Sequence, residues 1–263
     1  MSTYNPLLQS QEPTYYDVTL PSKGISYVEE GSINDIFEPD AIIDGVVKIR
    51  ALTTKDELIW TDQRLVEDLK APIIILKNTV LGLKKPELLI RADVETLLLE
   101  ARVLTYGKMT KVSWTCSECN NVNEITVDYT QLPIKQLGDF EELMLNFKNY
   151  KVYMTPIIFK EAVEIQKAND NDVSEQLDKI VSCIQRVDVA DEDGANQTVT
   201  DKRFIAQWVE QINPKDFKFI IEHFTEVNKI GTVMDLDVKC QNCSYKEKTD
   251  VVVDITNFFS EED

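Results

Sequence analysis

Glycine and histidine are scarce in this sequence. Its 263 residues include 8 glycines, scattered along the chain, and a single histidine. Scattered glycines exclude a Walker loop and a dinucleotide-binding motif, because both need several glycines within a few residues. His223 lies in a predicted helix with no catalytic motif around it, so we interpret it as a surface or half-buried side chain. We therefore predict a protein that is not an enzyme, with no catalytic and no cofactor-binding residues.

Long hydrophobic runs and positive charge are also lacking. No run of roughly 18 apolar residues exists, which argues against a membrane span. The first residues lack a basic region followed by an apolar core, so no signal peptide is expected. The chain has 28 Lys and Arg against 46 Asp and Glu, a net charge of −18. Because nucleic-acid binding needs clustered Lys and Arg, we expect an acidic surface that aids solubility or faces basic proteins.

The cysteines carry the clearest chemical signal. Four of the five form two Cys-x-x-Cys pairs, Cys116 with Cys119 and Cys240 with Cys243. A tight Cys-x-x-Cys turn supplies two thiolates to one edge of a tetrahedron, and two such turns complete the coordination of a structural zinc ion. We therefore predict that these four residues bind one structural zinc. Cys183 lies in an apolar helical pattern and is interpreted as a small buried hydrophobic residue.

Two other interpretations of the cysteine pairs stay open. A thiol-redox protein needs a thiol whose pKa is lowered by positive charge or a helix start, and Glu118 inside the first pair argues against this. The two pairs are alternatively separate dithiols without a metal. Paired free thiols in either case are typical of a reducing compartment such as the cytoplasm.

β-Branched residues flank both cysteine pairs. Segments 111–115 and 123–130 surround the first pair, and segments 234–239 and 248–256 surround the second. Each set is read as strand, knuckle and strand. The predicted fold class is α+β, mainly helical, with a small N-terminal β element. A split four-cysteine zinc ribbon, made of two knuckle hairpins, is expected to close around a helical insertion.

The pattern divides the chain into five expected segments. These are a flexible N-terminal tail (1–16), a β element plus helices (17–110), a first zinc-knuckle hairpin (111–130), a helical insertion (131–233), and a second zinc-knuckle hairpin with an acidic C-terminus (234–263). Apolar periodicity predicts helices over 54–69, 73–81, 93–104, 137–147, 156–168, 173–185, 200–212 and 214–229. Asp93 is expected to cap the third helix, and segment 150–154 to be a strand. Segment 186–199 is expected to be a solvated acidic loop, since it lacks the calcium-loop spacing.

An ordered series of short segments points to a family. It runs from Leu20-Pro-Ser-Lys-Gly24 through residues 47–57 and Asp93 to Arg102-Val-Leu-Thr-Tyr-Gly107, and it closes at residues 112–119. This combination resembles the T4-type baseplate and baseplate-hub assembly proteins of tailed phages.

The resemblance implies a non-enzymatic protein that helps to build the hub of a contractile-tail baseplate. Its implied partners are other phage tail and hub proteins, met in the host cytoplasm during assembly. Family members are hub components of the virion or assembly factors absent from it. The alternative function is a zinc-ribbon adaptor for nucleic acid or transcription machinery, which acidic residues around the knuckles disfavour, namely Glu118, Glu124, Asp235 and Asp237.

Overall fold

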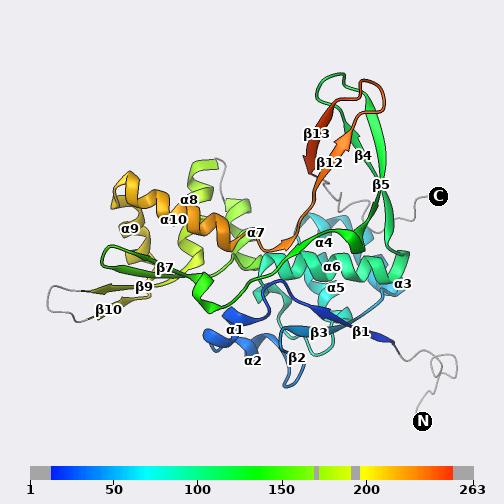
Figure 1. The fold of residues 1–263 in the computed structure, drawn as a ribbon. Coiled ribbons are helices and arrows are strands. Elements are labelled where there is room, and N and C mark those ends of the chain that lie inside the picture. Colours follow the sequence, from blue (N-terminus) through cyan, green and yellow to red (C-terminus); the bar gives the residue numbers. More distant parts are fainter. Residues whose placement is uncertain (1–12, 169–171, 191–195, 251–263) are drawn as a thin grey trace, which may run out of the picture.

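The computed structural model describes residues 13–168, 172–190 and 196–250, and Figure 1 shows three parts. The body combines helices with a small sheet, a second group of helices and strands lies to one side, and two hairpins project from the body. Helices hold 44% and strands 28% of the described residues, in five small antiparallel sheets. The prediction of a mainly helical chain closed by a split zinc ribbon is therefore wrong.

The body begins with a three-stranded antiparallel sheet. β1 (Tyr15–Thr19) pairs with β3 (Val46–Arg50), and β2 (Ile42–Ile43) lies on the other edge of β3. Val18 of β1 lies opposite Val47 of β3, and both are buried. The short helices α1 (Ile25–Glu29) and α2 (Ile33–Ile36) fill the connection between β1 and β2. This sheet is the small N-terminal β element expected from the sequence, and the alternate residues Val47 and Ile49 of β3 are buried.

Four helices complete the body. They are α3 (Thr54–Thr61), α4 (Gln63–Glu67), α5 (Ala71–Thr79) and α6 (Arg91–Tyr106), with a 3-10 turn, η2 (Pro86–Leu88), before α6. The single helix predicted over 54–69 is broken at Asp62, whose backbone is extended. The Asp62 carboxylate accepts the Arg64 N–H at 3.1 Å and so starts α4 as a new helix. α6 buries an apolar stripe that includes Leu97 and Ala101.

Asp93 lies within the first turn of α6 and does not cap it. Its side chain is fully buried and accepts three hydrogen bonds: from the Ser22 N–H at 3.0 Å, the Ser22 hydroxyl at 2.5 Å and the Tyr27 hydroxyl at 2.7 Å. The Tyr27 hydroxyl in turn accepts the Ile90 N–H at 2.7 Å. Burial raises the pKa of Asp93, although the bonds from Ser22 and Tyr27 oppose this. One carboxyl thus ties the Leu20-Pro-Ser-Lys-Gly24 segment to the longest helix.

The second group contains a four-stranded sheet in the order β10-β9-β8-β7. Its strands are β7 (Met144–Phe147), β8 (Tyr150–Met154), β9 (Ile184–Ala190) and β10 (Asn196–Val199). Its helices are α7 (Phe159–Ala168), α8 (Asp172–Cys183), α9 (Lys202–Gln211) and α10 (Pro214–Val227). Four of the predicted helices are thus confirmed, as is the strand over 150–154.

Two predictions in this group are wrong. The helix expected over 137–147 is a 3-10 turn, η4 (Phe140–Leu143), followed by β7. The acidic loop expected over 186–199 is largely the hairpin of β9 and β10, and residues 191–195 of it lie outside the described part. Asp188 is a strand residue here: its carboxylate accepts the Thr198 hydroxyl at 2.6 Å across the hairpin, while Val187 is buried. Alternation of charged and valine side chains fits a strand with one buried face.

A narrow neck, formed by β6 (Ile134–Lys135) and β11 (Gly231–Thr232), joins the second group to the body. These two strands pair antiparallel, and the Val233 N–H donates to the Pro133 carbonyl at 2.8 Å. The Leu137 N–H donates to the Pro21 carbonyl at 2.8 Å, which connects the neck to the segment held by Asp93. η3 (Tyr129–Gln131) leads into the neck.

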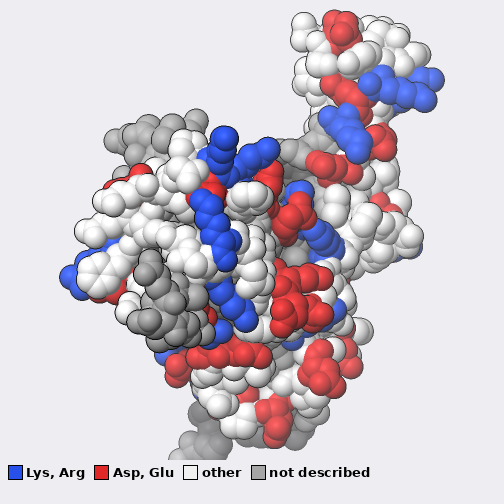
Figure 2. All heavy atoms as spheres, turned by 60° about the vertical axis from the view of Figure 1, so that its left-hand side comes forward, with Lys and Arg blue, Asp and Glu red and all other residues white. Residues whose placement is uncertain are grey.

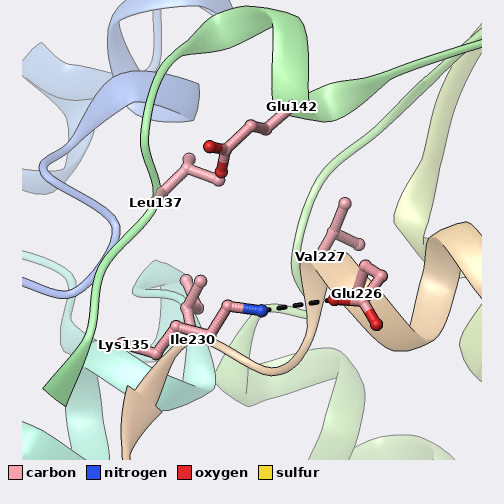
Figure 3. Close-up of a pocket in the computed structure, with 6 residues that line it drawn as sticks. All are labelled: Lys135, Leu137, Glu142, Glu226, Val227 and Ile230. Carbon is pink, nitrogen blue, oxygen red and sulfur yellow. Dashed lines mark hydrogen bonds and ion pairs between the residues drawn. The ribbon is translucent and has the colours of Figure 1, made fainter. Parts of the chain in front are cut away.

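A pocket of about 290 Å³ lies beside the neck. Figure 3 shows it between β6, the turn that carries Glu142, and the end of α10. Lys135 pairs with Glu226 at 3.3 Å, and Glu142 accepts the Gly138 N–H at 2.9 Å. Since its charged groups already have partners within the chain, we treat this pocket as part of the packing between the two groups.

Charge is unevenly distributed on the second group. Figure 2 turns this side toward the reader and shows Lys and Arg side chains in a column beside a group of Asp and Glu side chains.

None of the helices in the described residues is both long enough and apolar enough to span a membrane.

Candidate metal centre

The projecting part, which we call the tower, consists of two β-hairpins (Figure 1). β4 (Met109–Thr115) pairs with β5 (Val122–Asp128), and β12 (Asp235–Lys239) pairs with β13 (Lys246–Asp250). The strand, knuckle and strand order predicted around both cysteine pairs is confirmed for the described residues. Each hairpin is a separate two-stranded sheet, and no described strand of one pairs with the other, so a continuous ribbon is absent.

The two cysteine turns have the same backbone conformation. In each turn the N–H of the first cysteine donates to the carbonyl five residues ahead, and the N–H four residues ahead donates back to that cysteine's carbonyl. In the first turn the Cys116 N–H donates to the Asn121 carbonyl and the Asn120 N–H to the Cys116 carbonyl, both at 3.0 Å. In the second turn the Cys240 N–H donates to the Tyr245 carbonyl at 2.8 Å and the Ser244 N–H to the Cys240 carbonyl at 3.0 Å. Asn120 and Ser244 occupy the same left-handed position, with φ of 54° and 62°. Because the two turns share one backbone conformation, they orient their pairs of thiols in the same way.

The four sulfur atoms converge between the hairpins. All four Sγ atoms of Cys116, Cys119, Cys240 and Cys243 lie within 4.8 Å of one another. Cys116 and Cys243 are 3.7 Å apart and Cys119 and Cys240 are 3.6 Å apart, both pairs crossing from one hairpin to the other. A tetrahedral zinc with bonds of about 2.3 Å separates its sulfurs by about 3.8 Å. Disulfides need about 2.05 Å, and all four are free cysteines. The arrangement therefore suits one metal ion.

A small hydrophobic cluster, separate from the main core, supports the sulfurs. Trp114 and Val238 are buried there with Cys116 and Cys240, which are 0% and 1% exposed. Cys119 is half-buried and Cys243 is exposed. Cys116 and Cys240 are thus shielded from solvent, while Cys243 faces it.

Polar contacts across the tower hold the turns in register. Glu247 accepts the Ser117 N–H at 3.2 Å and the Ser117 hydroxyl at 2.7 Å. Asn123, buried at 2% exposed, accepts the Gln241 N–H at 2.9 Å. Sequence reasoning missed these residues, because a polar residue more than 100 positions from its partner carries no local signal.

The second turn acts differently on its two thiols: the pKa of Cys240 is lowered, whereas that of Cys243 is raised, because burial and the neighbouring thiols outweigh the hydrogen bond from the Tyr245 N–H. The N–H groups of Cys243 and Asn242 point at the Cys240 sulfur and lower the pKa of that thiol. The Asn242 side chain approaches the Cys119 sulfur at 3.7 Å. Hydrogen bonds to ligand sulfurs stabilise their negative charge and orient them toward the ion. The four-sulfur donor set in turn suits zinc or iron better than magnesium or calcium.

The other two singled-out residues lie outside the centre. Cys183 is buried at the end of α8, where burial raises the pKa of its thiol to about 12. It behaves as the buried hydrophobic residue that was predicted. His223 is half-buried in α10, and burial lowers its pKa.

Asn123 provides a test of the supporting contacts. We expect Asn123→Ala to lower the metal affinity of the full chain roughly tenfold, because loss of an outer-sphere contact has effects of this size. The measurement is competition with a chromophoric chelator. Thr126→Ala, on the exposed side of β5, is the matched control and should leave the affinity unchanged. Equal affinities in the two variants would contradict a supporting role for Asn123.

Comparison with known proteins adds one match. A family model described as T4 bacteriophage base plate protein matches residues 16–260, which includes all four cysteines of the tower. No curated protein and no solved structure matches this chain.

Proposed function

Because this chain belongs to the family of T4 bacteriophage base plate proteins, we propose that it helps to build the baseplate hub through contacts with other tail proteins. The observation that supports this most is the family match over nearly the whole chain. Membership implies a component of the phage tail, and a structural family favours a role without catalysis. The hub, as the place of action within the baseplate, is our proposal.

The four thiols of the tower are proposed to bind a structural zinc ion. Cysteine sulfurs would fill all four positions, so no position is left for a water molecule that the metal could activate. The ion would join two hairpins that share no strand pairing, as a staple rather than a catalyst. The distances of 3.6 and 3.7 Å between sulfurs of opposite hairpins support this assignment.

We propose that the neck divides residues 131–233 from the body and the two hairpins, as the five segments expected from the sequence imply. Residues 131–233 would form an insertion between the two hairpins, and the pairing of β6 with β11 supports this division. The insertion would then offer a surface of its own to partners. A net charge of −18 favours basic protein surfaces over nucleic acid as those partners.

The experiment compares purified phage particles with an assembly intermediate of the hub, both from a host infected by the encoding phage. We expect mass spectrometry to detect the chain in the hub intermediate, since assembly is proposed to occur in the host cytoplasm. Its presence in the particle as well would identify a hub component of the virion. Its absence from both samples, with other hub proteins present, would contradict the proposal.

A further inference from the structure

The four thiols of the tower are not equally enclosed. Cys116 and Cys240 are buried within the small hydrophobic cluster of the tower, and Cys119 packs against that cluster. Cys243 is exposed and takes no part in the cluster. Packing therefore restricts access to three of the sulfurs and leaves the fourth open to molecules in solution.

The chain next to Cys243 leaves its sulfur accessible. Asn242 and Ser244, its two neighbours in the sequence, are exposed as well. The Asn242 side chain approaches the Cys119 sulfur at 3.7 Å, and its backbone N–H points at Cys240. Within the described residues, no side-chain amide or hydroxyl donates to the Cys243 sulfur. Support from neighbouring side chains thus reaches other ligands and not this one.

The polar contacts that align the two hairpins do not depend on Cys243. Glu247 accepts both donors of Ser117, and Asn123 accepts the Gln241 N–H at 2.9 Å. Catalytic zinc sites hold their ion with three protein ligands and a water molecule. The tower would therefore keep its ion and its fold while the sulfur of Cys243 is detached.

We propose that Cys243 is the exchangeable ligand of the zinc ion, the one that a thiol-bearing zinc donor or acceptor displaces first. The incoming thiol loses its proton and bonds to zinc as the Cys243 sulfur gives up its own bond, and the released thiolate takes up a proton. No electron is transferred. Metal then passes in and out on the solvent side of the folded tower. This route rests on the proposed zinc staple, whose exchange it describes.

Zinc isotope exchange in the full chain separates this route from exchange by unfolding. The chain is loaded with one isotope and mixed with a second isotope held by dithiothreitol, and native mass spectrometry follows the replacement. Denaturant accelerates steps that expose buried surface. Displacement at Cys243 should therefore keep its rate in urea below the unfolding transition. A zinc exchange rate that rises with urea in parallel with amide hydrogen exchange in β4 and β12 would overturn the proposal.

Two serine variants of one turn provide a matched comparison. Cys243→Ser removes the exposed ligand, and Cys240→Ser removes a buried ligand to which two backbone N–H groups point. Loss of an outer contact alone changes metal affinity by about 10–100-fold, so loss of a ligand should change it at least as much. We expect Cys243→Ser to keep one zinc per chain and to exchange it at least about tenfold faster than wild type.

Cys240→Ser should bind zinc at least about tenfold more weakly than Cys243→Ser in competition with a chromophoric chelator. Amide hydrogen exchange in the tower strands shows whether each variant keeps its fold. Loss of zinc from Cys243→Ser, or equal affinities of the two variants, would overturn the proposal.

Alkylation of the zinc-loaded chain identifies the sulfur that leaves first. Limiting iodoacetamide should modify Cys243 before the other three ligands, and native mass spectrometry should find zinc still bound to the singly modified chain. First modification at Cys119, or modification of all four ligands together, would overturn the proposal. Cys183, buried at the end of α8, is the internal control and should stay unmodified.

The staple and its exchange route fail in different ways. A wild-type chain that binds no zinc contradicts the staple and, with it, the route through Cys243. A wild-type chain that holds one zinc but exchanges it only as the tower opens contradicts the route alone. Cys183→Ala, which removes a thiol outside the tower, should leave both zinc content and exchange rate unchanged.

Discussion

The double variant Cys116→Ser with Cys119→Ser is expected to lose its metal and the order of the tower. Two of four sulfur ligands are removed, and a structural site does not hold its ion with the remaining pair. Zinc contributes on the order of ten kcal/mol to folding in small metal-dependent domains. Native mass spectrometry should show one zinc per wild-type chain and none in the variant. Hydrogen exchange should show loss of protection in β4, β5, β12 and β13.

The body should survive this change. Its hydrophobic core shares no buried residue with the small cluster that surrounds Cys116 and Cys240, although the partly buried Ile125 and Leu236 pack against both. We therefore expect the cooperative thermal transition of the body to remain while the tower opens. Cys183→Ala is the matched control, since it removes the fifth thiol and should keep a full complement of zinc. Unchanged metal content and unchanged exchange protection of the four tower strands in the double variant would remove the support for a zinc staple.

Asp93→Ala is expected to have the largest effect on the body. The substitution removes the acceptor of three hydrogen bonds and leaves the Ser22 and Tyr27 donors buried without a partner. Each such donor costs about 1–3 kcal/mol, so we expect a loss of roughly 3 kcal/mol or more in the free energy of unfolding. Urea denaturation of the full chain measures it. Glu95→Ala, exposed on the same helix, should change stability by less than about 0.5 kcal/mol.

Asp93 also makes a pH dependence testable, through comparison with Asp93→Asn. Burial raises the pKa of Asp93 in the folded state. The folded chain therefore binds this proton more tightly than the unfolded chain, whose aspartates titrate near about 3.9. The contribution is fully present below that value and is lost as pH rises through the folded-state pKa. We expect the stability of wild type relative to Asp93→Asn to fall as pH rises from about 4. A rise would contradict a raised pKa of Asp93 in the folded state.

Local patterns in the sequence singled out the four cysteines of the tower because these cysteines lie in two short, self-contained turns. The Cys-x-x-Cys spacing and the β-branched flanks each specify a hairpin without reference to the rest of the chain. That the two turns would meet rested on the coordination chemistry of zinc, and the sulfur positions agree with it. The contacts that align the hairpins, such as Asn123 with Gln241, depend on tertiary structure and left no trace in the pattern.

The errors in the fold arose where charged residues occupy strands. Asp188 suggested a solvated loop, but in β9 it lies on the outer side of a hairpin whose other side buries Val187. Segment 137–147 mixes apolar and acidic residues and was predicted to be a helix, yet Asp139 caps only a 3-10 turn there by accepting the Glu141 N–H at 3.0 Å. Asp93 looked like a helix cap because aspartate favours that position. Its burial depends on Ser22 and Tyr27, about 70 residues earlier, which no local pattern reveals.

The four cysteines proposed to bind zinc come from opposite ends of a long stretch of chain. A nascent polypeptide that has left the ribosome as far as residue 230 carries only Cys116 and Cys119, two of the four sulfurs. Full coordination of the proposed ion would wait until Cys240 and Cys243 emerge, after the whole insertion has been made. Metal uptake would then mark a finished molecule, and a chain cut short within the insertion would leave synthesis with exposed thiols that distinguish it from a complete one.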